Sequence, residues 1–295
     1  MKNRGLILTL IILLSVVAIA ILVFLVLLLT GNTRLGYINF THRVSEELVL
    51  EETYDSTFNT ILINAFVADI DVKTSSDEQI KVFVYGDKER TNVDTSNGKL
   101  TITTKGKKCF GICFNQKIDK VEVYIPSTFD KELEVNNDYG NVVIDAFLNS
   151  NMTVTEKCGD VSIQGGNEVK VNNSFGDIRI KEANKVHVKE SAGDVTVGKV
   201  NDAVIHNNYG DIEVSEVTNY MDIKQDCGDV NIDRAVLNKD SKIVNHLGDI
   251  EIGFTNEIYI DAKTSLGDVK VRQNNHNADI ILKIENSCGD IEVDN

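Results

Sequence analysis

Eight aspartates recur at one position of an internal repeat, each directly after a glycine and directly before a valine or isoleucine. They are Asp160, Asp177, Asp194, Asp211, Asp229, Asp249, Asp268 and Asp290. Stacked repeats would place these carboxylates about 5 Å apart, and carboxylate oxygens are ligands for calcium. Asp177, Asp194, Asp211 and Asp229 are therefore candidates for calcium binding.

The alternative to calcium binding is that these aspartates have a structural role. Each carboxylate could accept hydrogen bonds from backbone N–H groups of its own repeat or of the next one. Asn141 takes the same position in the first repeat, and the glycine-rich nonapeptide that binds calcium is absent. We therefore favour hydrogen bonding, and we assign no metal, catalytic or cofactor-binding residue.

The five cysteines fall into two groups. Cys109 and Cys113 lie between two expected strands, where a disulfide could join them in an oxidising compartment. Free thiols are the alternative, and a zinc site would need four ligands, for which no matching histidine pair is present. Cys158, Cys227 and Cys288 directly precede a repeat glycine, where other repeats have Tyr, Phe or Leu, so we expect them in the core.

No sequence pattern predicts catalysis. The chain has no serine nucleophile elbow, phosphate-binding loop or dinucleotide fingerprint. Its net charge of −15 argues against nucleic acid and against anionic lipid as partners. We expect a protein that is not an enzyme and that needs no cofactor.

The repeat glycines mark corners that position all of these residues. They are Gly159, Gly176, Gly193, Gly210, Gly228, Gly248, Gly267 and Gly289, preceded by Gly140, and their spacing is 17–22 residues. Val or Ile stands two and four residues after each glycine, and an apolar or small residue stands directly before it. We expect these side chains to face inward, with glycine in a left-handed conformation that side chains disfavour.

One repeat cannot fold alone. Burying four or five aliphatic side chains contributes roughly 6–15 kcal/mol, whereas ordering about 18 residues costs roughly 18–36 kcal/mol. Stacked neighbours must supply the remainder. The expected fold is therefore all-β, a parallel β-solenoid with coils of about 18–19 residues.

The N-terminal region predicts a membrane anchor. Residues 6–30 are apolar and uncharged, which is long enough for a transmembrane helix and too long for a cleaved signal peptide. Residues 1–5 then form a cytoplasmic tail, because Lys2 and Arg4 precede the helix. Residues 31–50 form a stalk, and residues 51–295 form an extracytoplasmic solenoid with regular coils from about residue 131.

Residues 51–130 read as the start of the same body. The string "VADIDV" at 67–72 repeats the corner pattern with Ala68 in the glycine position, and "SNGKLTI" at 96–102 predicts a hairpin turn.

The chain ends six residues after Gly289, so we expect the C-terminal coil to be the open end of the stack. Cys288, Ile291 and Val293 would then border an unpaired backbone edge, through which the protein could self-associate.

The strings "FVADIDVKTSS", "GKLTITTK" and "KVEVYIPSTF", followed by serial "GDV" and "GDI" units, resemble a bacterial family of domains of unknown function. This family is named the "putative adhesin" or β-strand-repeat family, and the resemblance covers about residues 50–295. It implies a β-solenoid at the cell surface or envelope, without an established enzymatic activity, and links to envelope stress in some relatives.

We expect a single-pass membrane protein that acts as a binding or scaffolding module at the bacterial cell envelope, in adhesion or in stress sensing. An envelope protein or a polysaccharide is the expected partner. A carbohydrate-active β-helix enzyme and a purely structural spacer are the alternatives.

Overall fold

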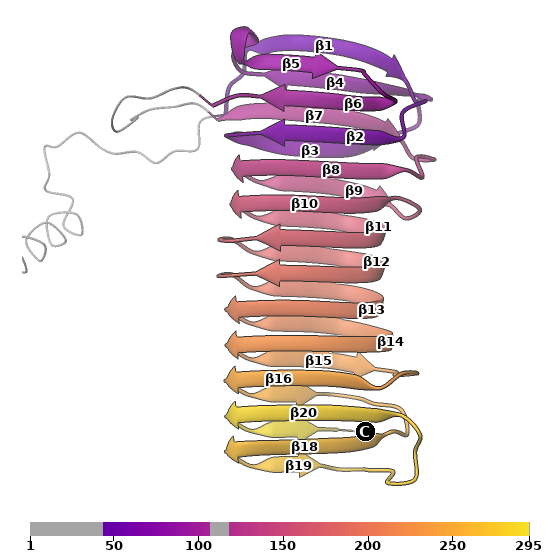
Figure 1. Ribbon diagram of the computed structural model, residues 1–295, viewed down its shortest axis with the longest axis vertical. Coiled ribbons are helices and arrows are strands. Elements are labelled where there is room, and N and C mark those ends of the chain that lie inside the picture. The colour runs from indigo at the N-terminus through magenta and orange to yellow at the C-terminus, as the bar shows by residue number, and fades with distance from the viewer. Residues whose placement is uncertain (1–43, 107–117, 295) are drawn as a thin grey trace, which may run out of the picture. The chain divides into compact units, whose positions relative to one another are not determined.

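The computed structural model describes residues 44–106 and 118–294 of the 295-residue chain. They belong to one compact unit, Arg43–Asn295, in which β-strands stack in one direction (Figure 1). The described residues contain 21 strands and a single 3-10 turn. An all-β solenoid is therefore confirmed. No helix among the described residues could cross a membrane, and the predicted anchor at 6–30 lies outside them.

The N-terminal part forms the first layers of the stack. Its elements are β1 (Leu48–Asp55), β2 (Thr60–Ala65), β3 (Ala68–Ser75), β4 (Gln79–Tyr85), η1 (Lys88–Arg90), β5 (Thr91–Asp94), β6 (Lys99–Thr104) and β7 (Asp119–Pro126). Because β1 begins at Leu48, strand structure starts within the segment assigned to the stalk.

Antiparallel strands cap this end of the solenoid. β4 pairs with β1 and with β7 in antiparallel orientation, and β5 pairs with β6 in the same way. Asn97 and Gly98 have φ angles of 57° and 70° between β5 and β6. A two-residue turn with positive φ at both positions is typical of a β-hairpin, so the predicted hairpin is confirmed.

The first parallel coil consists of β2 and β3. β2 pairs in parallel with β6 and β8, and β3 pairs in parallel with β7 and β9. Ala68 begins β3 in the glycine position, and Asp69 accepts a hydrogen bond of 2.9 Å from the backbone N–H of Asn141. Residues 51–130 are therefore continuous with the regular coils, as the "VADIDV" string indicated.

The regular coils follow in a stack of parallel strands. Their strands are β8 (Glu132–Tyr139), β9 (Val142–Phe147), β10 (Asn151–Cys158), β11 (Val161–Asn173), β12 (Ile178–Glu190), β13 (Val195–Tyr209), β14 (Ile212–Cys227), β15 (Val230–Ala235), β16 (Ser241–Leu247), β17 (Ile250–Ile252), β18 (Tyr259–Leu266), β19 (Val269–Val271), β20 (Ile281–Cys288) and β21 (Ile291–Val293). Equivalent residues lie side by side, as in the parallel pairing of Val161 with Ile178 and of Ile178 with Val195.

Each coil has two short faces that enclose a narrow aliphatic core. In the coil around Gly176, the buried residues are Val169 and Val171 before the corner and Ile178 and Ile180 after it. These positions follow the period-two alternation of the sequence. The inward positions two and four residues after the glycine are therefore confirmed.

Glycine is required at the corner. Gly176 has a φ of 129° and Gly210 a φ of 117°, values that L side chains rarely adopt. A Cβ atom on Gly210 would also overlap the carbonyl oxygen of Gly193 in the neighbouring coil. All eight predicted corner glycines and Gly140 have positive φ.

A ladder of amide side chains supports the edge opposite the glycine corners. Asn167 donates to Asn151 at 3.0 Å, Asn184 to Asn167 at 3.2 Å, and Asn201 to Asn184 at 2.8 Å. These bonds cross from coil to coil, so both edges of the solenoid are held by polar contacts between neighbouring coils.

The last two coils lie in reverse order. β20 pairs with both β16 and β18, and β21 pairs with both β17 and β19. The C-terminal coil therefore inserts between its predecessors, and the chain end marked C lies above β18 and β19 (Figure 1). Ile291 and Val293 are buried in the stack. The expectation that the C-terminal coil forms the open end is wrong; the coil of β18 and β19 lies there.

Candidate functional site

A column of exposed apolar side chains runs along the glycine edge of the solenoid. We call it the corner ladder and define it as the residues directly before each corner glycine: Tyr139, Cys158, Phe175, Ala192, Tyr209, Cys227, Leu247, Cys288 and Leu266, in spatial order. The exposed fraction is 60% for Phe175, 63% for Tyr209 and 70% for Leu266. The prediction that this position faces the core is wrong.

The reason lies two residues earlier, where a polar side chain fills the inside of the corner. Asn173 is buried, and its Nδ2 donates to the carbonyl oxygens of Gly159 at 3.1 Å and Gly176 at 3.2 Å. Asn207 bonds Gly193 and Gly210 in the same way. Because this amide satisfies the corner carbonyls from within, the residue before the glycine points outward.

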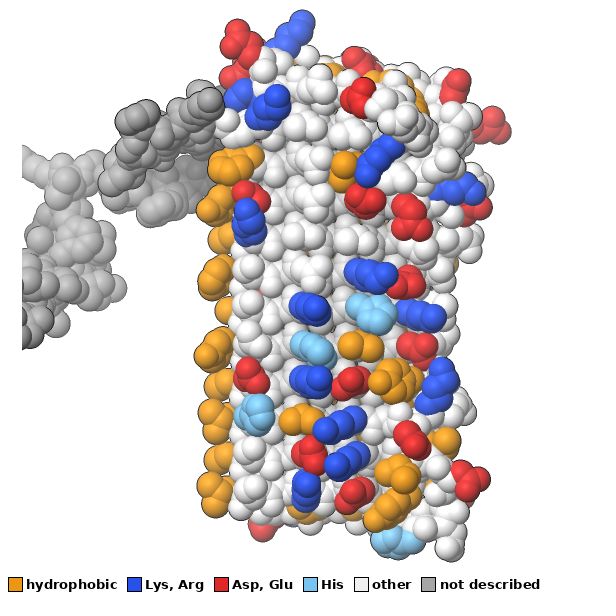
Figure 2. Space-filling model, viewed as in Figure 1, with side chains coloured by type: hydrophobic (Ala, Val, Ile, Leu, Met, Phe, Trp, Pro, Cys, Tyr) orange, Lys and Arg blue, Asp and Glu red, His pale blue; other side chains and the backbone are white. Residues whose placement is uncertain are grey.

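The corner ladder alternates between large and small side chains. Tyr139, Phe175, Tyr209, Leu247 and Leu266 are separated in space by Cys158, Ala192, Cys227 and Cys288. The alternation continues to the end of the stack because the last two coils are reversed. Figure 2 shows hydrophobic side chains along this edge of the molecule.

The corner ladder begins beside the first coil. The ring of Phe66 contacts the ring of Tyr139 edge to face, with centroids 6.0 Å apart. Phe66 is 42% exposed and Tyr139 is 49% exposed. A contiguous apolar strip of this kind is typical of an interaction surface.

The aspartates form a second column, which we call the Asp row, one glycine away from the corner ladder. Asp160 accepts a hydrogen bond from the backbone N–H of Asp177 at 2.9 Å, and Asp177 accepts one from Asp194 at 3.1 Å. The same bond continues through Asp211, Asp229, Asp249, Asp290 and Asp268. The bond from Asp194 to Asp177 also lowers the pKa of the Asp177 carboxyl.

The calcium candidates Asp177, Asp194, Asp211 and Asp229 therefore lie in one line, with one carboxylate oxygen of each bonded to the backbone of a neighbouring coil. Within residues 44–106 and 118–294, no cluster of three or more His, Cys, Asp or Glu side chains could hold a metal ion.

The cysteines are placed as follows. Cys109 and Cys113 lie outside the described residues, so their disulfide stays a prediction. Cys158 and Cys288 are exposed on the corner ladder, and Cys227 is half-buried there. The expectation that these three are core residues is wrong, for the reason given above.

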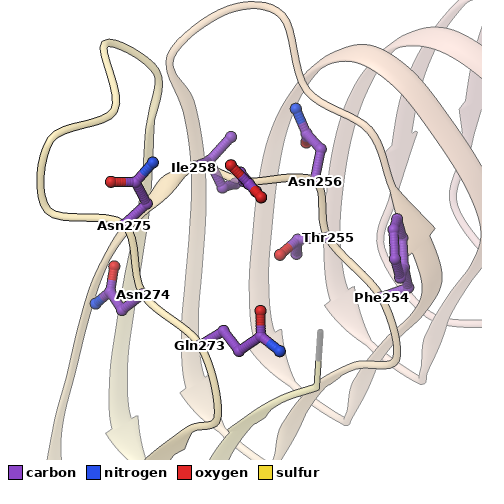
Figure 3. A pocket seen from close by; sticks show the side chains of 8 residues that line it. Phe254, Thr255, Asn256, Ile258, Gln273, Asn274 and Asn275 are labelled. Carbon is purple, nitrogen blue, oxygen red and sulfur yellow. The ribbon is translucent and has the colours of Figure 1, made fainter.

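A cleft of about 570 Å³ lies near the C-terminal end, lined by Phe254, Thr255, Asn256, Glu257, Ile258, Gln273, Asn274 and Asn275 (Figure 3). Two of its amides serve the fold. Asn256 exchanges hydrogen bonds with the backbone of Leu237, and Asn274 exchanges them with the backbone of Ile260 on β18. Asn274 thereby covers part of the outer strand edge of the stack.

Strand alternation alone does not predict the corner ladder, because the signal lies in the third residue before each glycine. That position holds Asn, Glu, Gln or Thr in every regular coil. An invariably polar residue at an inward strand position indicates that the corner interior is already occupied. The alternation of large and small residues was visible up to Leu247.

The chain is similar in sequence to one known domain family. The Toastrack DUF4097 family model matches residues 58–184 and 181–295. No curated protein matches this chain.

Two of the solved structures that match this chain are bacterial proteins. A "putative adhesin" from Bacteroides fragilis is 17% identical, with 85% of this chain and 99% of that chain covered and a TM-score of 0.46. A "putative lipid binding protein" from Parabacteroides distasonis is 16% identical, with 82% and 96% covered and a TM-score of 0.48.

The two segments matched by the family model extend over all of the regular coils and the first parallel coil. This chain therefore belongs to the Toastrack (DUF4097) family.

Proposed function

We propose that this protein is a binding and scaffolding module of the bacterial cell envelope, and that the corner ladder is its docking surface. The exposure of the corner ladder carries this proposal. Large apolar residues such as Phe175, Tyr209 and Leu266 are each more than half exposed to solvent. A purely structural spacer would not need them there.

The proposal includes a membrane anchor. The apolar segment 6–30 would cross the membrane with residues 1–5 in the cytoplasm, and the solenoid would project outside. The rigid stack would then present the corner ladder along its length to the cell wall or to another envelope protein. Adhesion and stress sensing would both use such a surface. Membership of the Toastrack family supports a binding or scaffolding role.

Binding of the full-length protein to isolated cell-wall material tests the docking surface. We expect the double variant Phe175→Ser/Tyr209→Ser to be retained less than the wild type. Leu148→Ser is the matched control, because Leu148 is 55% exposed but does not belong to the corner ladder. Equal retention of all three proteins would refute the docking surface.

Protease added to intact, wall-stripped cells tests the topology. We expect cleavage of the solenoid, whereas full protection of residues 31–295 would contradict the anchor orientation.

A further inference from the structure

We propose that the partner of the corner ladder is a cationic peptide segment in the polyproline II conformation, with an apolar residue at every third position. This inference rests on the proposed function and names the chemistry of the partner. Two features of the glycine edge carry it, namely its charge and the period of the corner ladder.

The charge follows from the Asp row. The Asp row runs parallel to the corner ladder, with one glycine between the two positions in each coil. Its members repeat at every coil, about 4.8 Å apart. Within the described part of the chain, the ion pairs join only Asp177 of the eight aspartates to a cation, Arg179, at 2.8 Å. Seven of the eight aspartates use their Oδ1 for the backbone N–H of a neighbouring coil, as Asp194 does for Asp211. Apart from the Oδ2 of Asp177, which is bonded to Arg179, the Oδ2 atoms of these seven can therefore contact a partner.

A second copy of this chain packed in antiparallel orientation does not match this charge. Two glycine edges packed in antiparallel orientation would bring one Asp row against the other, and like charges repel. A partner that lies along the edge is complementary when it carries Lys or Arg beside its apolar residues.

The period follows from the alternation of large and small residues. Gaps at Cys158, Ala192, Cys227 and Cys288 recur every second coil, about 9.6 Å apart. A polyproline II helix has three residues per turn and a rise of about 3.1 Å per residue, so equivalent side chains recur about every 9.3 Å. In an extended β-strand they recur about every 6.8 Å. Only the first spacing fits successive gaps.

The flanking aromatic residues suit this conformation. Tyr139 and Phe175 lie on either side of the gap at Cys158, and Phe175 and Tyr209 lie on either side of the gap at Ala192. Proline-rich segments in the polyproline II conformation dock between aromatic side chains in several peptide-binding domains, with little loss of entropy because the helix is preformed. A Lys at the position between apolar residues would face the Asp row.

Titration calorimetry with synthetic peptides tests the proposal on the full-length protein in neutral-detergent micelles. The probe repeats Leu-Pro-Lys. One control repeats Leu-Pro-Glu, which reverses the charge, and another repeats Ser-Pro-Lys, which removes the apolar side chain. A third alternates Lys and Leu, which changes the period from three to two. We expect binding of the probe that weakens with salt, and weaker binding of all three controls.

The matched variants separate charge from structure. Asn141 occupies the aspartate position of its coil, and its Oδ1 accepts the N–H of Asp160 at 3.0 Å. A triple variant Asp194→Asn/Asp211→Asn/Asp229→Asn can therefore keep the backbone bonds while it loses three charges. We expect an unchanged melting temperature and about tenfold weaker binding of the probe. Phe175→Ser/Tyr209→Ser should also weaken binding.

Absent binding of the Leu-Pro-Lys peptide, equal binding of its Glu counterpart, or unchanged binding by the triple variant would overturn the proposal. If wall retention depends on Phe175 and Tyr209 but not on the three aspartates, the docking surface stands and its partner is an uncharged molecule such as a polysaccharide. If wall retention depends on neither, the proposed function fails independently of the peptide result.

Discussion

The Oδ1 atom of Asp177 accepts the backbone N–H of Asp194 in the next coil at 3.1 Å. This bond joins the same carboxylate position from coil to coil, so a row of like charges is held at the spacing of β-strands. The repulsion is offset because seven of the eight carboxylates each satisfy an N–H group that the corner would otherwise leave without a partner.

Replacing Asp194 distinguishes the hydrogen bond from the charge. Asp194→Asn retains an acceptor for the N–H of Asp211 and should leave the melting temperature nearly unchanged. Asp194→Ala removes the acceptor and should lower the free energy of unfolding by about 1 kcal/mol. Thermal melts followed by circular dichroism compare the two. Equal losses would mean that the hydrogen bond contributes nothing measurable.

Calcium should not stabilise the protein if the role of the Asp row is to accept backbone hydrogen bonds from neighbouring coils. We expect the same melting temperature with millimolar calcium and with a chelator, because a ligand that binds only the folded state must raise it. A rise of several degrees with calcium would contradict this expectation and restore Asp177, Asp194, Asp211 and Asp229 as metal ligands.

The corner itself should tolerate no side chain. Gly210→Val places a β-branched residue at a φ of 117° and against the carbonyl oxygen of Gly193, so it should cost at least about 2–3 kcal/mol. Glu213→Val, on the exposed face of β14, is the matched control and should change stability by less than about 0.5 kcal/mol. Urea denaturation provides the comparison. Similar losses in both variants would place Gly210 outside a strained corner.

A buried carboxyl inside one corner should make stability depend on pH. Glu156 is 1% exposed, and its Oε1 accepts the N–H groups of Lys157 and Cys158 at 3.2 Å. Its Oε2 and the Oδ1 of Asn137 are buried without a hydrogen-bond partner in the described residues. Burial raises the pKa of Glu156 from 4.5 to about 7.

The folded protein therefore keeps a proton on Glu156 that the unfolded chain releases above its ordinary pKa. Stability from this group is fully present below about pH 4.5 and is lost as the pH rises through 7, by up to about 3 kcal/mol. Glu156→Gln should remove this dependence, since Gln225 occupies the equivalent position of a later coil. Unfolding at pH 5 and pH 8 measures it, with Glu213→Gln as the exposed control. Identical pH profiles for wild type and Glu156→Gln would refute the buried protonated carboxyl.

The coil could be predicted from the sequence because each residue type in the repeat favours one local conformation. The corner is specified by a glycine with positive φ and by an aspartate that bonds the neighbouring coil, as at Gly176 and Asp177. The strand that leaves it is specified by two β-branched residues, as at Ile178 and Ile180. The residue before the glycine was misassigned because strand alternation alone places it inside. Only the geometry of Asn173 shows that an amide already fills that space.

The order of the last coils could not be read from the repeats, because β18 and β20 offer the same pattern to β16. The structure places the coil with the larger aliphatic residues, Ile284 and Ile291, between two neighbours. The smaller Ala262 and Val269 hold the corresponding positions in the outer coil, where Ala262 is half-exposed and Val269 is 42% exposed. Burying the more apolar coil on both sides removes more apolar surface from water.

This order gives opposite expectations for two lysine substitutions. Ile291 on β21 is 1% exposed and lies between β17 and β19, so Ile291→Lys buries an unpaired charge and should destabilise the protein by roughly 3–5 kcal/mol. Val269 on β19 is 42% exposed at the end of the stack, and Val269→Lys should cost less than about 1 kcal/mol. Coils stacked in chain order would reverse the two results, because Val269 would then lie inside and Ile291 at the open end. Thermal melts of both variants decide between the orders.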